Sequence, residues 1–339
     1  MEYDFESNFN KEYSPVTRKI IRLLSNNSRI TVSEIAKELK MSRSTIASRL
    51  KKIEQAFQIS YTLGLDATKL GLDSPHVILV RFEKKPDYEK IRGALARTYV
   101  VQFAARIKGT YDLLIYANAY SLPEYLTWDM RMRSELMPSY KARWYTSDVS
   151  FSRLGFQPVR SEAIEKAKLP KKEREMLKVL NQNSRIPFNQ LSKTLGMNYK
   201  TTVYNFNKLI KLGYIKRFTI TMRLRSDISL MTMFNNFVPT QNYKGVEELA
   251  KNFFTKDDRT PLVNRFLMCS NLVGAYDFFT LGAYDDPKIG YSRGILLYNK
   301  LFKKYDITNT EYGTIEEVLV GMLPIRSIDA AKEFGHFHI

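Results

Sequence analysis

The chain has 339 residues and a mass of 39.5 kDa, and 44% of its residues are hydrophobic, which is enough for roughly two to four domains with buried cores. Its formal charge of +18 favours a polyanionic partner such as nucleic acid, with a generally basic proteome as the plain alternative. No run of about 18 apolar residues is present and the first residues are acidic and polar, so we expect a cytoplasmic protein with no membrane span and no secretory signal.

Cysteine and histidine are scarce. The single cysteine, Cys269, allows neither a disulfide within the chain nor a thiolate metal cluster. Two of the three histidines, His336 and His338, lie in the last residues, which we expect to be frayed. We therefore predict no metal and no cofactor.

The first segment predicts three helices. Ser14-Pro15 is a good start for the first, with serine as the cap and proline in the first turn. Apolar residues then recur at helical spacing from Val32 to Leu39, and a short link leads to a third helix capped by Ser42. The outer face of this helix carries groups that suit phosphates and base edges in a major groove. Its predicted DNA-binding residues are Ser42, Arg43, Ser44, Thr45, Ser48, Arg49 and Lys52.

The alternation from Ile59 to Leu65 is typical of the strands of a wing, and a small α/β domain is predicted after it. The expected strands are His76 to Phe82, Val100 to Ile107, Tyr111 to Ala117 and Ala142 to Arg153, and the expected helices are Asp87 to Arg97 and Leu122 to Leu136. The order β-α-β-β-α-β is the ferredoxin-like arrangement. Helices cover one face of such a sheet, so pairing two copies is an economical way to bury the other face.

The chain repeats itself. A shift of 156 residues aligns, without a gap, the Asn-Ser-Arg-Ile at 27–30 with that at 183–186. A second match aligns Gly109 with Gly274 at a shift of 165, so the second copy holds an insertion, which we place at 256–261. The repeat predicts a second head and a second α/β domain.

The second head has its own capped helix, beginning at Asn198. Its predicted DNA-binding residues are Asn198, Tyr199, Lys200, Thr201, Tyr204, Asn205 and Lys208. From Tyr199 to Ser226 the chain has seven basic residues and no acidic one. We predict wing contacts to phosphates by Lys216, Arg217 and Arg223, whereas the plain alternative is that these charged faces are simply solvated.

The predicted fold class is α+β, with two winged helix-turn-helix domains and two ferredoxin-like βαββαβ domains in alternating order. The heads are placed at 1–66 and 171–225, the ferredoxin-like domains at 67–157 and 226–325, a linker at 158–170 and a tail at 326–339. Helices of the second ferredoxin-like domain are expected near Gly245 to Phe254 and Ile289 to Lys304.

Each half resembles the Lrp/AsnC (feast/famine) family of bacterial and archaeal regulators. The matching features are the Asn-Ser-Arg-Ile, Ile35-Ala36 before the turn, Ser42, Arg49 and the Gly-x-Tyr-Asp of each α/β domain. The resemblance covers nearly the whole chain twice. It implies a dimer fused into one polypeptide, whose effector domains pair through their sheets, with assembly into homo-oligomers and a small-molecule effector such as an amino acid. The effector-binding residues it implies are Gly109, Asp112, Gly274 and Asp277, for which turn and strand-start roles are the alternative.

The two copies depart from the family in different places. The glycine before the wing is kept as Gly213 but replaced by Phe57 in the first copy. The arginine kept as Arg49 becomes Asn205 in the second copy. The two heads should therefore read different sequences.

Three functions remain open at this point. The first is a sequence-specific transcription regulator that binds double-stranded DNA and responds to a small-molecule effector. The second is an architectural DNA-binding protein with little sequence specificity, which the charge also supports. The third is an enzyme resembling the sirohaem decarboxylases, which need basic and histidine side chains around a tetrapyrrole. The α/β domains here contain only His76, and no catalytic triad or phosphate loop is evident, so we predict that the protein is not an enzyme.

Overall fold

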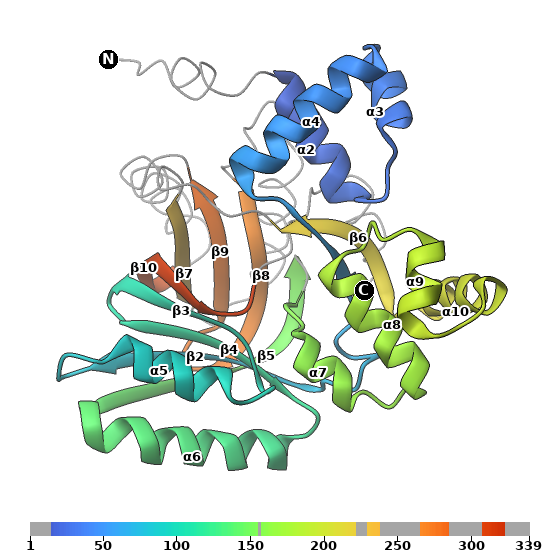
Figure 1. Cartoon of the computed structure of the whole chain (residues 1–339). Coiled ribbons are helices and arrows are strands. Elements are labelled where there is room, and N and C mark those ends of the chain that lie inside the picture. The colour runs from blue at the N-terminus through green and yellow to red at the C-terminus, as the bar shows by residue number, and fades with distance from the viewer. Residues whose placement is uncertain (1–14, 155–156, 222–228, 238–264, 285–306, 323–339) are drawn as a thin grey trace, which may run out of the picture.

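The computed structural model in Figure 1 describes residues 15–154, 157–221, 229–237, 265–284 and 307–322. Two three-helix heads lie beside a closed eight-stranded barrel, and a separate two-stranded sheet connects the heads. Within these ranges, no helix has the length and apolar character needed to cross a membrane.

Each head is a small helical bundle. The helices of the first are α2 (Pro15–Asn26), α3 (Val32–Leu39) and α4 (Arg43–Phe57), and those of the second are α8 (Lys171–Gln182), α9 (Phe188–Leu195) and α10 (Tyr199–Lys211). Apolar residues at helical spacing meet in each centre; Ile20, Leu24 and Ile46 are fully buried in the first head. These helices agree with the prediction, while the expected cap Ser14 lies outside the described residues.

The predicted wings are wrong in one respect. The strand after each head pairs antiparallel with its counterpart from the other head, instead of forming a hairpin within its own head. These strands are β1 (Ser60–Leu65) and β6 (Ile215–Thr221). Each strand also completes the other head's core, since Ile220 packs in the first head and Leu63 in the second. The physical reason is that the apolar face of each strand needs cover, which the first helix of the opposite head supplies.

The first ferredoxin-like domain agrees with the predicted β-α-β-β-α-β order. Its elements are β2 (Ser74–Phe82), α5 (Tyr88–Ala96), β3 (Val101–Gly109), β4 (Leu113–Ala119), α6 (Leu122–Tyr140) and β5 (Ala142–Leu154). The strands lie in the order β3-β4-β2-β5, and α5 and α6 cover the outer face of the sheet (Figure 1). The predicted linker contains a short helix, α7 (Ser161–Lys166).

The second half repeats this strand order. Its strands are β7 (Ser229–Phe237), β8 (Arg265–Gly274), β9 (Phe278–Tyr284) and β10 (Ile307–Val320). They lie in the order β8-β9-β7-β10, which matches the first domain position by position. The two expected helices near 245–254 and 289–304 and the insertion placed at 256–261 lie outside the described residues.

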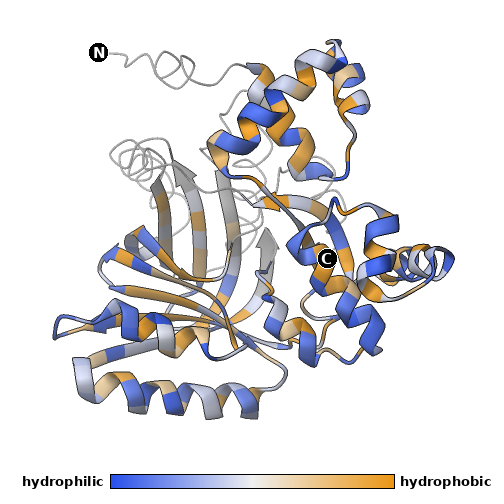
Figure 2. Cartoon of the chain, viewed as in Figure 1, coloured by the Kyte–Doolittle hydropathy of each residue, from blue (hydrophilic) through white to orange (hydrophobic). Residues whose placement is uncertain are grey.

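The barrel closes because the last strand of each sheet crosses to the other. β5 pairs with β2 and with β8, and β10 pairs with β7 and with β3. Figure 2 shows hydrophobic residues concentrated along β3 and β4, and the interior of the barrel is filled by apolar side chains from both sheets. Among these side chains are Tyr111 and Tyr276, which are equivalent in the repeat and whose hydroxyls are hydrogen-bonded to each other.

The glycines predicted to bind an effector lie at the two joints of the barrel. Gly109 pairs with Gly313, and a Cβ at Gly109 would lie 2.1 Å from the carbonyl oxygen of Tyr312. Gly274 has a φ of +139°, which a side chain rarely adopts. Asp112 accepts a hydrogen bond from the backbone N–H of Phe82 at 2.8 Å. Gly109, Gly274 and Asp112 thus each have a structural role, and effector binding at these residues stays a prediction.

His76 lies in β2 beneath α6 and is 3% exposed. Its ring stacks on Tyr125 with 3.4 Å between ring centroids, its Nε2 lies 2.8 Å from the hydroxyl of Ser74, and its Nδ1 lies 2.6 Å from Oδ1 of Asp148. Burial lowers the pKa of His76, and the nearby Asp148 and Asp129 carboxylates oppose this shift. The buried imidazole is therefore kept neutral at neutral pH.

We predict that Gly109→Ala lowers the melting temperature strongly, because its methyl group would overlap backbone at the β3–β10 joint. The matched control is Gly93→Ala in α5, where a Cβ meets nothing within 4 Å. Alanine at that helical position should stabilise the fold by about 0.5–1 kcal/mol. Thermal unfolding of both variants checks this, and equal melting temperatures would contradict the tight joint.

We also predict that stability falls as the pH drops below 6.5, the ordinary pKa of histidine. The native state holds His76 neutral while the unfolded chain takes up the proton, so acid favours unfolding. A His76→Gln variant should lose less stability between pH 7.5 and pH 5.5 than the parent protein. Parallel curves of melting temperature against pH for the two proteins would refute this role for His76.

Candidate nucleic-acid interface

Helix α4 presents the first set of predicted DNA-binding residues. Ser42 caps the helix by accepting the backbone N–H of Thr45 at 3.1 Å, and the apolar inner face is buried in the head. The outward residues Arg43, Ser44, Thr45, Ser48 and Lys52 are exposed, and Arg49 is half-buried. The structure thus places these predicted residues on α4 and its cap, outside the buried core of the head.

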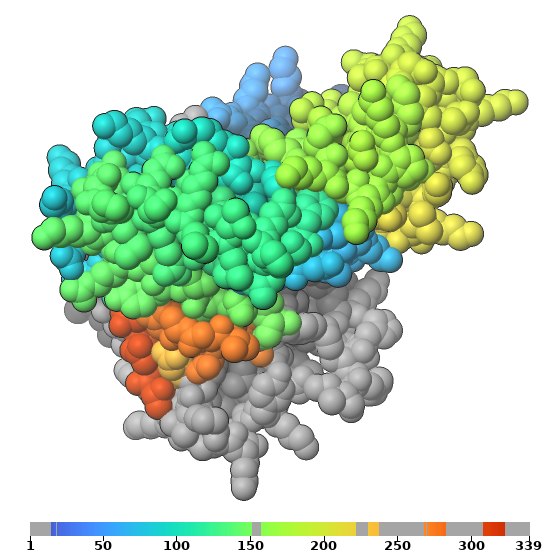
Figure 3. All heavy atoms as spheres, turned by 90° about the horizontal axis from the view of Figure 1, so that it is seen from below, coloured from blue at the N-terminus to red at the C-terminus, as the bar shows by residue number. Residues whose placement is uncertain are grey.

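Helix α10 presents the second set. Asn198 caps it by accepting the backbone N–H of Thr201 at 2.8 Å, as predicted. Two tyrosines dominate its outer surface, since Tyr199 is 52% exposed and Tyr204 is 67% exposed. Lys200 and Thr201 are exposed beside them, and Asn205 and Lys208 are half-buried. Figure 3 shows the second head projecting away from the surface of α5 and α6, with α10 in its yellow outer part.

Lys208 differs from its counterpart Lys52. Its Nζ lies 2.7 Å from Oε1 of Glu173, whose side chain is only 6% exposed, and this hydrogen bond raises the pKa of Lys208. The position equivalent to Glu173 in the first half is Thr17, so the first head has no carboxylate there. Lys208 thus has a structural partner that sequence reasoning missed.

Two of the residues predicted to be wing contacts, Lys216 and Arg217, lie on β6, one of the two strands that connect the heads. Lys216 forms an ion pair with Asp66 at 3.1 Å, and Arg217 donates to the side chain of Asn26 at 3.4 Å. Arg223 lies outside the described residues. Lys216 and Arg217 are thus both engaged within the protein.

The Asn-Ser-Arg-Ile motifs meet at the junction between the heads. The hydroxyls of Ser28 and Ser184 are 2.6 Å apart, and both residues are fully buried. The backbone N–H of Ser28 donates to the carbonyl of Phe218 in β6, and that of Ser184 donates to the carbonyl of Tyr61 in β1. Each motif therefore binds the strand that follows the opposite head.

The arginine of each motif reaches across the same junction. Arg29 donates to the carbonyl of Ser184 at 2.6 Å, and Arg185 donates to the carbonyl of Ile30 at 2.8 Å. Burial and the charge of Arg185 lower the pKa of Arg29. The Arg29 guanidinium also lies 5.1–5.8 Å from the ring centroids of Phe188, Phe206 and Phe218. The motif joins the heads, a role that its repeat alone does not reveal.

Comparison with known proteins supports the identity of the heads. Residues 17–54 match the AsnC-type helix-turn-helix domain, and residues 169–216 match a winged helix-turn-helix DNA-binding domain. The chain is similar to the siroheme decarboxylase NirDL, with a TM-score of 0.54 over 93% of this chain and 94% of that one, but the identity of 13% shows likeness of fold alone.

Two relatives extend the match beyond the heads. An HTH-type transcriptional regulator of Pyrococcus furiosus is 34% identical over 108 residues, which are 32% of this chain and 72% of the relative. The regulator LrpC of Bacillus subtilis is 30% identical over 104 residues, which are 30% of this chain and 72% of LrpC. The chain belongs to the Lrp/AsnC family of HTH-type transcriptional regulators.

Proposed function

We propose that this protein is a transcription regulator that binds double-stranded DNA in a sequence-specific manner, with α4 and α10 as its two recognition helices. The observation that carries the proposal is the pair of matched heads, each with a capped helix whose outward face displays hydrogen-bond donors and no carboxylate among the predicted contacts. A major groove admits such a helix, and donors of this kind suit base edges and phosphates.

The two helices carry different side chains at equivalent positions. Arg43 and Ser48 of the first head correspond to Tyr199 and Tyr204 of the second. An arginine suits guanine, which offers two acceptors in the major groove, whereas an aromatic ring suits the methyl group of thymine. Asn205, which replaces Arg49, suits adenine. We infer an operator with one guanine-containing half-site and one half-site rich in A·T pairs.

The junction between the heads supports a defined spacing of these half-sites. Buried serines, paired strands and crossed arginines connect the two heads at several points. Paired helix-turn-helix units meet half-sites about 34–36 Å apart, or at multiples of this distance. An imperfect palindrome with a fixed centre is therefore the expected target, and a small molecule is the expected modulator.

The architectural alternative rests on the charge of +18, which attracts any duplex. The likeness to NirDL concerns the fold and carries no activity to this chain. Selection from a random duplex library, followed by gel shifts in excess competitor DNA, tests the proposal. One enriched asymmetric motif is the expected result, and equal binding of all duplexes would leave only the architectural function.

We predict that Arg43→Ala costs about 1–3 kcal/mol of specific binding and relaxes selection at one base of the guanine-containing half-site. Tyr199→Ala, the equivalent change in α10, should relax only the other half-site. Binding-site selection with each variant provides the measurement. The asymmetry is wrong if both variants relax the same half-site.

We predict that Lys52→Ala weakens binding to all duplexes and lowers the slope of log affinity against log salt by about 0.9, because one phosphate contact is lost. Lys208→Ala is the matched change in the second head. It should leave the salt slope nearly unaltered but lower the melting temperature, because buried Glu173 loses its partner. Salt titrations and thermal unfolding of both variants measure the two effects, and identical changes in slope would argue against a structural role for Lys208.

A further inference from the structure

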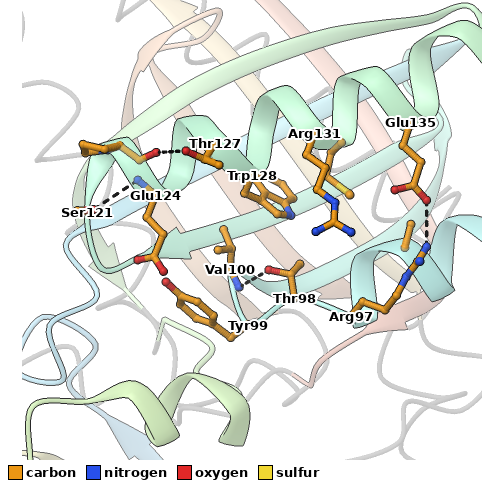
Figure 4. Close-up of a pocket in the computed structure, with 13 residues that line it drawn as sticks. Arg97, Thr98, Tyr99, Val100, Ser121, Glu124, Thr127, Trp128, Arg131 and Glu135 are labelled. Atoms are coloured by element: carbon orange, nitrogen blue, oxygen red, sulfur yellow. Dashed lines mark hydrogen bonds and ion pairs between the residues drawn. The ribbon is translucent and has the colours of Figure 1, made fainter.

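A cavity of about 540 Å³ lies between α5 and α6, on the outer face of the first ferredoxin-like domain. This volume falls within the range of roughly 300–1,000 Å³ that is usual for sites that bind small molecules. Its apolar part is formed by Ala94, Val100, Trp128 and Met132, all of which belong to the domain core. Charged side chains from both helices stand around this apolar part (Figure 4).

The charges around the cavity are unequally paired. Arg97 forms an ion pair with Glu135 at 3.0 Å, and Glu124 lies 3.4 Å from Nζ of Lys166. Arg131 is exposed, and among the described residues its guanidinium has no ion-pair partner. Figure 4 shows Arg131 pointing from α6 into the space above the segment from Arg97 to Val100. The positive charge of Arg131 is therefore available to pair with an anionic group of a bound molecule.

Trp128 has an unmet hydrogen-bond donor at the same place. The residue is 6% exposed, and its buried Nε1 has no acceptor among the described residues. The other tryptophan, Trp144, donates from Nε1 to Oδ1 of Asp129 at 2.9 Å. A buried N–H without an acceptor is costly, and most such groups in proteins have one. Beside Trp128 in Figure 4 lies Arg131, so a single anionic group could serve both.

We propose that this cavity binds a small monocarboxylate with an apolar body. The carboxylate pairs with Arg131 and, once this exposed side chain shifts, accepts the indole N–H of Trp128. The apolar body lies against Val100 and Met132. An amino acid fits less well, because its ammonium group would need an unpaired carboxylate. The two carboxylates that line the cavity already have cationic partners: Glu124 pairs with Lys166, and Glu135 pairs with Arg97.

This site is separate from the residues that the family resemblance implies for an effector. The cavity lies at the start of β3, next to Thr98 and Val100, whereas Gly109 ends the same strand. Asp112 comes three residues after Gly109, and its side chain accepts a hydrogen bond from the backbone N–H of Phe82. The proposal needs no DNA, so it stands or fails independently of the proposed regulatory function.

The test uses the full chain labelled with ¹⁵N, in which the indole N–H groups of Trp128 and Trp144 give two signals that a Trp128→Phe variant assigns. On titration with 3-phenylpropionate, the Trp128 signal should move downfield and saturate while the Trp144 signal stays in place. The uncharged 3-phenylpropanamide and L-phenylalanine should each bind about tenfold more weakly or worse, as expected for loss of a charge-assisted contact or for an unpaired ammonium group.

Two variants then test the residues. Arg131→Gln should weaken 3-phenylpropionate binding about tenfold or more. Lys90→Gln, which removes one positive charge from α5 outside the cavity, should leave binding unchanged. Melting temperatures equal to that of the parent show that both variants are folded. The proposal is overturned by the absence of a saturating Trp128 shift, by equal binding of the amide or of L-phenylalanine, or by unchanged binding to Arg131→Gln.

Discussion

The contact between two buried serine hydroxyls, Ser28 and Ser184, lies where the two halves of the chain meet. The two residues are one repeat length apart, so the junction is close to a twofold axis that relates the halves. A group near such an axis contacts its own copy. Thr62 and Thr219 are paired on the β1–β6 ribbon in the same way, and each donates to a carbonyl at the end of the opposite head's first helix. Neither head has a complete core without the strand of the other.

In the barrel, too, strands from each half pair with the other half. The sheet of the first ferredoxin-like domain has an apolar face that α5 and α6 do not cover, and this face is buried against apolar side chains of the second sheet. The long strands β5 and β10 cross from one sheet to the other, so no open edge is left in the barrel. Glycines lie where backbones meet at these crossings, because a side chain would overlap a neighbouring carbonyl. Gly109 and Gly274 thus have structural roles at the crossings.

Fusion in one chain allows the halves to differ while their junction stays paired. The arginines of the junction cross between heads in both directions, but Arg29 lies over three phenylalanine rings and Arg185 over the single ring of Tyr61. The recognition helices differ further, with exposed tyrosines on α10 and with Glu173 paired to Lys208 only in the second half. A homodimer has identical subunits, so it could not encode this asymmetry in sequence.

The sequence by itself determined the features that depend on near neighbours in the chain. Helical spacing, the caps Ser42 and Asn198 and the alternating strands predicted the heads, the outward faces of α4 and α10 and the first βαββαβ domain, because these signals act over a few residues. Only the tertiary structure decided which strand pairs with which, that Lys208 forms an ion pair with Glu173, and that the Asn-Ser-Arg-Ile motifs join the heads. These contacts connect residues up to 216 positions apart, as in the pairing of Ala104 with Val320. Local pattern shows that an apolar face needs a partner, but the partner is chosen by packing of the whole chain.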